Sequence, residues 1–316
     1  MSPGDARGLR QEGLTCLNTP QTSTRQSIPA PQATYAGGAL DAARMALILD
    51  SVTHFPADAR RRASIAASHG GVYAAYLAAK AGVKAVILCD AGVGREQAGV
   101  GGLDWLEKLG VPAAAIGHHS ARIGDGADCA QRGVITFANK RAMVFGVAPG
   151  MSAREALDRL DREKLPPCPT PPKSEERRFR LAEAEAGGVR VHAIDSAGLV
   201  LPEDEGHIVL TGSHGALLGG KPETAIKIPV FAAVYNDADF GIDDAGSARL
   251  PVLDARGIAG ATVSAWSARI GDGQSTYHDG FVTAVNTRAR ACGGEIGISA
   301  KELVARLVAA RMKDLK

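Results

Sequence analysis

Aromatic side chains are scarce in this sequence, at 4% of 316 residues. Proteins that bind single-stranded nucleic acid stack bases on such rings, so their scarcity argues against that function. The formal net charge is only +2, which gives no strong electrostatic field toward nucleic acid or an anionic membrane. The composition therefore predicts neither nucleic acid nor a membrane as a partner.

Several familiar signals are also missing. No apolar run approaches the roughly 18–20 residues that a membrane-spanning helix needs. The sequence contains neither a Gly-x-Gly-x-x-Gly dinucleotide fingerprint nor a Gly-x-x-x-x-Gly-Lys-Ser/Thr loop, which argues against an NAD enzyme or a P-loop ATPase. The cofactor is left unknown, with a divalent metal ion as one option.

The five cysteines are odd in number and no two stand at Cys-x-x-Cys spacing, so no disulfide framework is indicated. Free thiols are typical of a reducing compartment, and we expect a cytoplasmic protein. Residues 1–38 are rich in Gly, Pro, Gln, Ser and Thr and lack the apolar core of a signal peptide. We expect them to form a mobile tail or to precede the true start of the protein.

One heptad, Ser-Ala-Arg-Ile-Gly-Asp-Gly, occurs at 120–126 and again at 267–273, an offset of 267 − 120 = 147. At this offset residues 90–142 align with 237–289 without a gap, and 21 of the 53 pairs are identical. Upstream, Ser-His-Gly at 68–70 matches 213–215 at an offset of 145. We interpret the sequence as an internal duplication.

The duplication predicts five parts: a tail at 1–38, an α/β repeat at 39–146, a helical and Pro-rich connector at 147–190, a second α/β repeat at 191–298 and an amphipathic helix at 299–316. The connector shows a charged helical pattern on each side of its prolines. Leu303, Leu307 and Met312 mark the apolar side of the final helix.

Within each copy, short β-rich runs alternate with helical patterns, which predicts βαβ units. In the second copy we expect strands near 189–194, 207–211, 230–235 and 261–265. We expect helices at 222–227, 244–256 and 279–292, the last capped by Asp279. The predicted fold class is α/β, as two tandem homologous βαβ-type repeats with doubly wound, mainly parallel sheets that form a pseudo-twofold pair.

Every repeated polar motif follows a predicted strand, where parallel sheets bind ligands. Ser68 and His69, with their counterparts Ser213 and His214, precede Gly-rich stretches. Each His is a candidate general base or metal ligand. The alternative is a turn in which the His only bonds a neighbouring loop.

Asp90 and Asp237 end β-rich runs, where an unpaired carboxylate is costly to bury, so we interpret both as site residues. Asp243 and Asp244 are interpreted as helix caps. A divalent cation among the carboxylates of the second copy is a further option.

The heptads supply Arg122 and Arg269, whose planar guanidinium groups suit a carboxylate or a phosphate. Asp125 and Asp272 follow three residues later, so an Arg–Asp clasp that fixes the loop and binds nothing is the alternative.

Ser120 and Ser267 open the heptads and are candidate nucleophiles if a histidine lies near, as in a His214–Ser267 pair. His118-His119 occurs only in the first copy, where the second has Ala265-Trp266. With His69 and Asp90 these histidines could form a metal site.

We therefore expect a cytoplasmic hydrolase, lyase or isomerase that acts on a small, anionic, carboxylate-bearing metabolite. The predicted catalytic residues are His214, Asp237, Ser267, His69, Asp90 and Ser120. The predicted substrate-binding residues are Ser213, Arg269, Asp272, Ser68, Arg122 and Asp125. Two alternatives stay open: a non-catalytic metabolite-binding protein, and polar loops that serve only the interface between the halves. A homo-oligomer is a further expectation.

Overall fold

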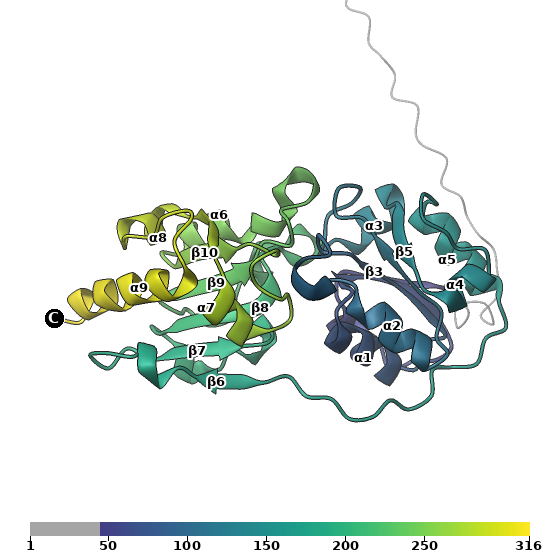
Figure 1. Ribbon diagram of the computed structural model, residues 1–316, viewed down its shortest axis with the longest axis horizontal. Helices are drawn as coiled ribbons and strands as arrows, with labels where there is room; N and C mark the ends of the chain where they lie inside the picture. The colour runs from purple at the N-terminus through teal and green to yellow at the C-terminus, as the bar shows by residue number, and fades with distance from the viewer. Residues whose placement is uncertain (1–44) are drawn as a thin grey trace, which may run out of the picture. The chain divides into compact units, whose positions relative to one another are not determined.

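The computed structural model describes residues 45–316, so the predicted tail at 1–38 lies outside the described residues. The fold is α/β, with two mixed, mostly parallel sheets interleaved with helices (Figure 1). Both sheets belong to one compact unit of the chain.

The first sheet has five strands in consecutive order. They are β1 (Leu47–Leu49), β2 (Ala63–His69), β3 (Ala85–Cys89), β4 (Ala113–Ile116) and β5 (Ile135–Ala138). Strands β1 to β4 pair in parallel, and β5 is antiparallel to β4. The accompanying helices are α1 (Val72–Lys80), α2 (Gly101–Lys108), α3 (Gly126–Arg132), α4 (Lys140–Val144) and α5 (Ala153–Arg162), with 3-10 helices η2 (Val52–His54) and η3 (Arg95–Gln97).

The second sheet has six strands, again in consecutive order. They are β6 (Arg178–Arg180), β7 (Val191–Ile194), β8 (Ile208–His214), β9 (Ala232–Asn236), β10 (Ala259–Val263) and β11 (Val282–Val285). Strands β7 to β10 are parallel, and the edge strands β6 and β11 are antiparallel. The helices are α6 (Arg249–Ala255), α7 (Gly273–Asp279), α8 (Thr287–Ala291) and α9 (Ala300–Asp314), with 3-10 helices η4 (Ala182–Ala184), η5 (Ala197–Leu199), η6 (Pro202–Asp204), η7 (Leu218–Gly220), η8 (Pro222–Thr224) and η9 (Ile242–Ser247).

The central strands β2, β3 and β4 of the first sheet are buried on both faces, because alternate side chains enter two separate cores. In β2, Ile65 packs against α3 and α5, whereas its neighbour Ala66 packs against α1 and α2. Helices therefore cover both faces, as predicted. The strand order, however, runs consecutively and lacks the reversal of a doubly wound sheet, so that part of the prediction is wrong.

The helix predicted at 279–292 is also wrong. Asp279 is the last residue of α7 instead of an N-cap, and β11 and α8 follow it. The β-rich run 281–285 supplies the extra edge strand, which pairs with β10. The true cap is Asn286, whose side chain accepts a hydrogen bond from Ala289 N.

The connector contains one helix where two were expected. The first charged pattern forms α5, which packs on the first sheet. After the prolines the chain forms the edge strand β6 and the 3-10 helix η4 in place of a second charged helix. Beyond the second sheet, the chain forms α9, which buries Leu303 and Leu307.

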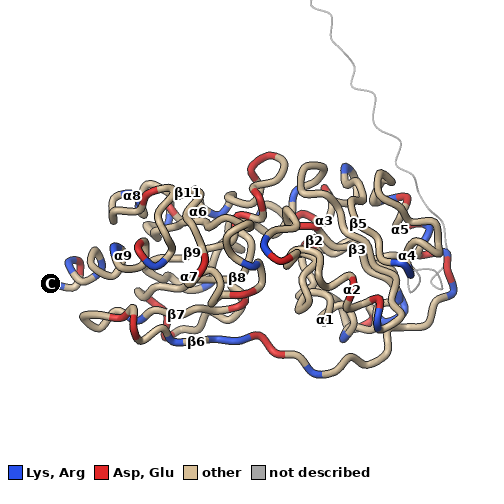
Figure 2. The backbone as a smooth tube through the Cα atoms, in the orientation of Figure 1, with Lys and Arg blue, Asp and Glu red and all other residues tan. Residues whose placement is uncertain are grey.

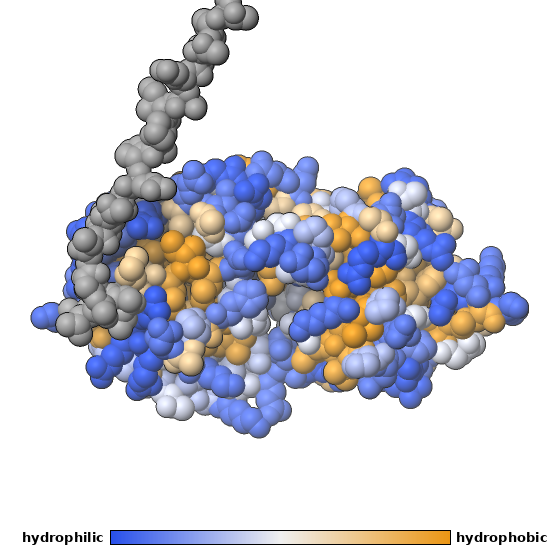
Figure 3. All heavy atoms as spheres, turned by 180° about the vertical axis from the view of Figure 1, so that it is seen from behind, coloured by the Kyte–Doolittle hydropathy of each residue, from blue (hydrophilic) through white to orange (hydrophobic). Residues whose placement is uncertain are grey.

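No helix among residues 45–316 combines the length and the apolar character needed to cross a bilayer. The surface carries apolar patches interrupted by hydrophilic side chains, as one face of the protein shows (Figure 3). Exposed large apolar residues include Val144, Trp266 and Ile296.

Two buried asparagines, Asn139 and Asn286, each link a short helix to a neighbouring strand, one in each sheet. Asn139 accepts hydrogen bonds from Ala113 N (3.0 Å) and Ala142 N (2.9 Å), and its amide nitrogen donates to the carbonyl oxygens of Leu103 (3.2 Å) and Val111 (2.9 Å). One side chain therefore caps α4 and also joins it to α2 and β4.

Replacing Asn139 by Ala should lower the free energy of unfolding by about 2–4 kcal/mol, because the helix cap is lost and buried backbone groups are left unpaired. Ser152→Ala, which removes only the exposed cap of α5, should cost about 1 kcal/mol. Urea denaturation measures both. Equal losses in the two variants would contradict the role assigned to Asn139.

Candidate functional site

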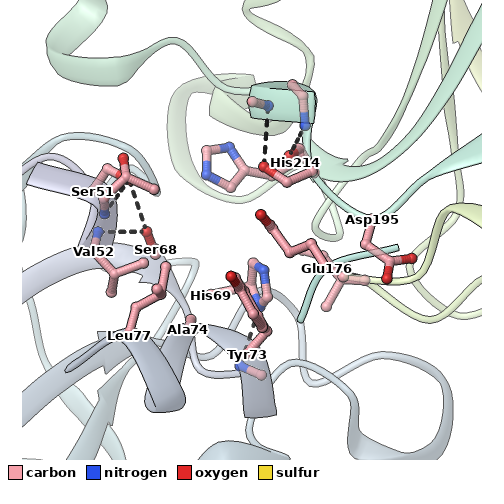
Figure 4. Close-up of a pocket in the computed structure, with 18 of the residues that line it drawn as sticks. Ser51, Val52, Ser68, His69, Tyr73, Ala74, Leu77, Glu176, Asp195 and His214 are labelled. Atoms are coloured by element: carbon pink, nitrogen blue, oxygen red, sulfur yellow. Dashed lines mark hydrogen bonds between the residues drawn. The ribbon is translucent and has the colours of Figure 1, made fainter. Parts of the chain in front are cut away.

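A cavity of about 890 Å³ lies where loops of the two sheets face each other. Its polar lining comes mainly from the carboxyl ends of β1, β2, β7 and β8, from the first turn of α1 and from the segment 174–177 (Figure 4). The Ser-His pairs of both predicted copies therefore open into the same space.

His69 and His214 are the last residues of β2 and β8. Nδ1 of His69 accepts a hydrogen bond from Gly71 N (3.1 Å), and Nδ1 of His214 accepts one from Ala216 N (3.3 Å). A backbone amide can only donate, so the hydrogen of each neutral imidazole is on Nε2. Among the described residues no hydrogen-bond partner occupies either Nε2.

Burial keeps both imidazoles neutral. It lowers the pKa of His69 to about 4, and it lowers the pKa of His214 well below the usual 6.5, with help from the nearby Arg249 guanidinium. At neutral pH each ring is therefore a hydrogen-bond donor through Nε2.

Each imidazole also lies against the other half of the protein. A Cβ atom on Gly271, in the second heptad, would lie 3.2 Å from Cε1 of His69, and one on Gly124, in the first heptad, would lie 3.4 Å from Cε1 of His214. Both glycines have a left-handed backbone, with φ of +85° for Gly124 and +83° for Gly271. The heptads thus form part of the wall behind each ring.

Ser68 and Ser213 line the cavity, but their hydroxyls are held by the backbone. Ser68 Oγ accepts a hydrogen bond from Val52 N (3.1 Å), and Ser213 Oγ accepts one from Ala197 N (2.9 Å). In the part of the chain that the structure describes, neither hydroxyl bonds an imidazole. These serines fix the loops after β1 and β7.

The heptad arginines are paired with carboxylates of both halves. Arg269 lies 3.2 Å from Asp272 and 3.2 Å from Glu96 of the other half. Arg122 lies 3.3 Å from Asp125 and 3.7 Å from Asp243 of the other half. Acidic and basic residues occur along the backbone where the loops of the two sheets meet (Figure 2). Of the predicted Arg–Asp pairs, Arg269 and Asp272 line the cavity, and Arg122 and Asp125 do not.

The remaining heptad side chains organise the loop itself. Ser120 Oγ donates to Gly117 O (2.7 Å), and Ser267 Oγ donates to Ser264 O (3.0 Å). Asp125 caps α3 and Asp272 caps α7. Neither Ser120 nor Ser267 reaches the cavity, and the structure does not bring Ser267 and His214 together.

Asp90 and Asp237 also lie away from the cavity. Asp90 Oδ1 accepts a hydrogen bond from His118 N (2.9 Å) and lies 2.8 Å from His118 Nδ1, a contact that raises the pKa of that imidazole. Asp237 Oδ1 accepts one from Ala265 N (2.8 Å), and burial raises the pKa of this carboxyl.

Two cavity residues were missed by the sequence analysis. Arg249, in the first turn of α6, is 5% exposed, and no carboxylate of residues 45–316 lies within ion-pair distance of it. Glu176 lies in the segment before β6, and burial raises the pKa of its carboxyl. In Figure 4 its side chain is drawn between His69 and His214.

A sequence signal existed for Arg249 alone. At the offset of 147 its counterpart is Gly102, so Arg249 is a charged residue that one copy has and the other lacks. Glu176 lies in the connector, outside both copies, and no local pattern distinguishes it from Glu175.

Comparisons with protein-family models, with curated proteins and with solved structures found no match to this chain.

The depressed pKa of His69 predicts a pH-dependent stability. The unfolded chain binds a proton below about pH 6.5, and the folded chain does so only below about pH 4. As the pH falls through this window the free energy of unfolding should decrease, by at most about 3 kcal/mol from His69. His69→Gln removes that contribution.

Urea denaturation of wild type and His69→Gln from pH 7 to pH 4 measures it. The stability advantage of wild type over the variant should shrink as the pH falls, and His214→Gln should follow the same trend. An advantage that stays constant over this range would contradict the burial of a neutral imidazole.

Proposed function

We propose that the cavity binds a small, anionic, carboxylate-bearing metabolite and that the protein is an isomerase or a lyase that moves a proton on it. The observation that carries this proposal is Arg249, a buried guanidinium in the cavity wall that has no carboxylate partner among residues 45–316.

Two carbonyl oxygens and an aromatic ring hold the guanidinium group of Arg249 in place. Its Nε donates to Ala216 O (2.9 Å), its Nη1 donates to Ala225 O, and its Cζ lies 4.8 Å from the centre of the Tyr235 ring. These neutral partners fix the planar group without neutralising it. A buried charge is costly unless it is paired, so an anionic ligand would supply the missing partner.

The two imidazoles add neutral donors around the same space. Their Nε2–H groups suit a carboxylate or carbonyl oxygen, and they would strengthen their bonds as negative charge develops on it. The first turn of α1, with Val72 and Tyr73 in the cavity wall, adds backbone N–H groups that the helix itself leaves unpaired.

Glu176 is the proposed proton-transfer group. A carboxyl whose pKa is raised by burial is closer to the working range of a general acid or base than an exposed one. As a carboxylate it would take a proton from the carbon beside the bound carbonyl group. The resulting charge on oxygen would be held by the imidazole N–H groups and Arg249.

Return of the proton to a different position gives an isomer, and departure of a neighbouring group gives elimination. A hydrolase with a serine nucleophile is the less favoured reaction, because Ser68 and Ser213 have backbone partners and no bonded imidazole.

We further propose that the two halves arose by duplication and are related by a pseudo-twofold axis. Contacts between them are reciprocal: Arg95 N donates to Ala265 O (2.8 Å), and the aligned pair Ile242 N and His118 O repeats the bond at 2.8 Å. The proposal includes a cytoplasmic protein, which the free thiols of Cys89, Cys129, Cys168 and Cys292 support.

The binding proposal is tested by thermal unfolding with a panel of short mono- and dicarboxylates. A ligand at 100 times its dissociation constant should stabilise wild type by about 2.7 kcal/mol. Arg249→Met should abolish this shift, because the ligand loses its counter-charge. Arg290→Met, on the exposed face of α8, is the matched control and should behave as wild type.

Circular dichroism must show that Arg249→Met is folded. If the folded variant keeps the full ligand shift, or if no carboxylate shifts wild type, anion binding at Arg249 is wrong.

The catalytic proposal is tested by incubating wild type in D₂O with each carboxylate that binds and following loss of its C–H signals by NMR. Glu176→Gln should slow exchange by about 10²–10⁴-fold while ligand binding persists. Glu183→Gln is the control, since that side chain is exposed and does not line the cavity. Binding without exchange or turnover in wild type would instead favour the non-catalytic metabolite-binding protein.

A further inference from the structure

A second polar cluster lies outside the cavity, where the loop after β4 meets the loop after β9. His118 and His119 come from the first loop and Asp239 from the second. One ligating atom from each of the three side chains lies within 4.8 Å of the others. The backbone bond from Ile242 N to His118 O (2.8 Å) joins the two loops.

His118 presents an unused lone pair to this cluster. Its Nδ1 lies 2.8 Å from Asp90 Oδ1, and because a carboxylate only accepts, the neutral ring carries its hydrogen on Nδ1 and leaves Nε2 bare. Nε2 is buried, and no described residue gives it a hydrogen bond. It lies 3.3 Å from Oδ2 of Asp239.

Asp90 is held firmly in this orienting position. Besides the imidazole, its carboxylate accepts hydrogen bonds from His118 N (2.9 Å) and Thr136 Oγ1 (2.9 Å). A histidine that binds a metal usually donates the hydrogen on its other ring nitrogen to a carboxylate or a carbonyl oxygen. This hydrogen bond fixes the tautomer and the orientation of the ring.

Asp239 is placed by an uncommon backbone. Ala238, Asp239 and Phe240 all have positive φ, at 48°, 59° and 57°. Such conformations cost free energy in residues other than glycine and persist where the surroundings enforce them. Opposite Asp239 stands Gly92, where a Cβ atom would lie 2.3 Å from the Asp239 Cβ. The absence of a side chain there makes room for the carboxylate.

The spacing also fits a shared ion. Two ligand atoms that each lie about 2.0–2.1 Å from a tetrahedral metal are about 3.3 Å apart, which is the distance from His118 Nε2 to Asp239 Oδ2. Two imidazoles and one carboxylate form a borderline ligand set that suits Zn²⁺ better than Mg²⁺ or Ca²⁺.

We propose that His118, His119 and Asp239 bind one divalent transition-metal ion, with Zn²⁺ preferred, and that this ion clamps the two halves together. His118 and His119 belong to the first half and Asp239 to the second. Water completes the coordination. The sequence had grouped these histidines with His69, which the structure places in the cavity.

The positions of the three ligands can be compared with the aligned positions of the other half. At the offset of 147, the second half has Ala265 and Trp266 in place of the histidines, and Gly92 stands where Asp239 would be repeated. The pseudo-equivalent position therefore lacks all three ligands, and the stoichiometry is one ion per chain.

The test uses the full, tag-free chain after treatment with a chelator, titrated with Zn²⁺ and with Mg²⁺ by calorimetry. Wild type should bind one equivalent of Zn²⁺, with a higher unfolding temperature, and bind Mg²⁺ far more weakly. His119→Ala and Asp239→Asn should each weaken Zn²⁺ binding at least about tenfold and lose the thermal shift.

The matched controls are His278→Ala and Asp244→Asn, two exposed residues of the same types, the second only five residues from Asp239. Both should bind Zn²⁺ as wild type does. Because neither ligand variant disturbs the Asp90–His118 bond, circular dichroism without metal should show both folded, and Asp239→Ser replaces Asp239→Asn if that variant is not.

Wild type that binds no Zn²⁺ would overturn the proposal. So would ligand variants that bind Zn²⁺ with the affinity of the controls, since the ion would then lie elsewhere. Neither outcome depends on the carboxylate assays, which probe a separate cavity.

Discussion

Backbone hydrogen bonds between the loops of the two sheets fix how the two halves of the protein face each other. The loop after β3 donates from Arg95 N to Ala265 O, and the loop after β9 donates from Ile242 N to His118 O, both at 2.8 Å. These bonds hold the strand-end loops of the two sheets in contact. His69 then lies against the heptad of the second half and His214 against the heptad of the first.

The two halves share several backbone contacts but supply different side chains to the cavity. Both halves contribute an imidazole and a serine to the cavity, but one contributes α1 and the other contributes Arg249. Arg249 N donates to Gly215 O, as Gly102 N donates to Gly70 O, both at 2.8 Å. The same backbone position therefore carries a buried cation in one half and only a hydrogen in the other. An asymmetric ligand is suited to such a cavity.

The sequence predicted the strands that carry the site and the α/β class, because short apolar runs between helical patterns and the polar motifs at their ends are local signals. It could not assign the heptad arginines, since their partners Glu96 and Asp243 are supplied by the opposite half. The predicted site residues were also chosen because they occur in both copies. Neither the arginine at 249 nor the glutamate at 176 is repeated in the other copy, so predictions based on repeated motifs missed both.

Errors in the predicted elements have the same origin. A pattern such as 279–292 fits a helix when only its own residues are considered, but pairing with β10 converts part of it into a strand. Likewise, the sequence grouped His118 with His69, but the structure places it beside Asp239, 121 residues later in the chain (239 − 118). Contacts between distant segments decided both cases.

The central claim is that two neutral imidazoles from different halves donate to one bound anion. Nitrogen-resolved NMR of the histidine rings tests it most directly, as the pH is lowered with and without a bound carboxylate. The account predicts that His69 and His214 stay in the Nε2–H form where an ordinary histidine is charged, and that one ligand shifts both Nε2 signals. Protonation of either ring near pH 6.5, or a response from only one of them, would contradict it.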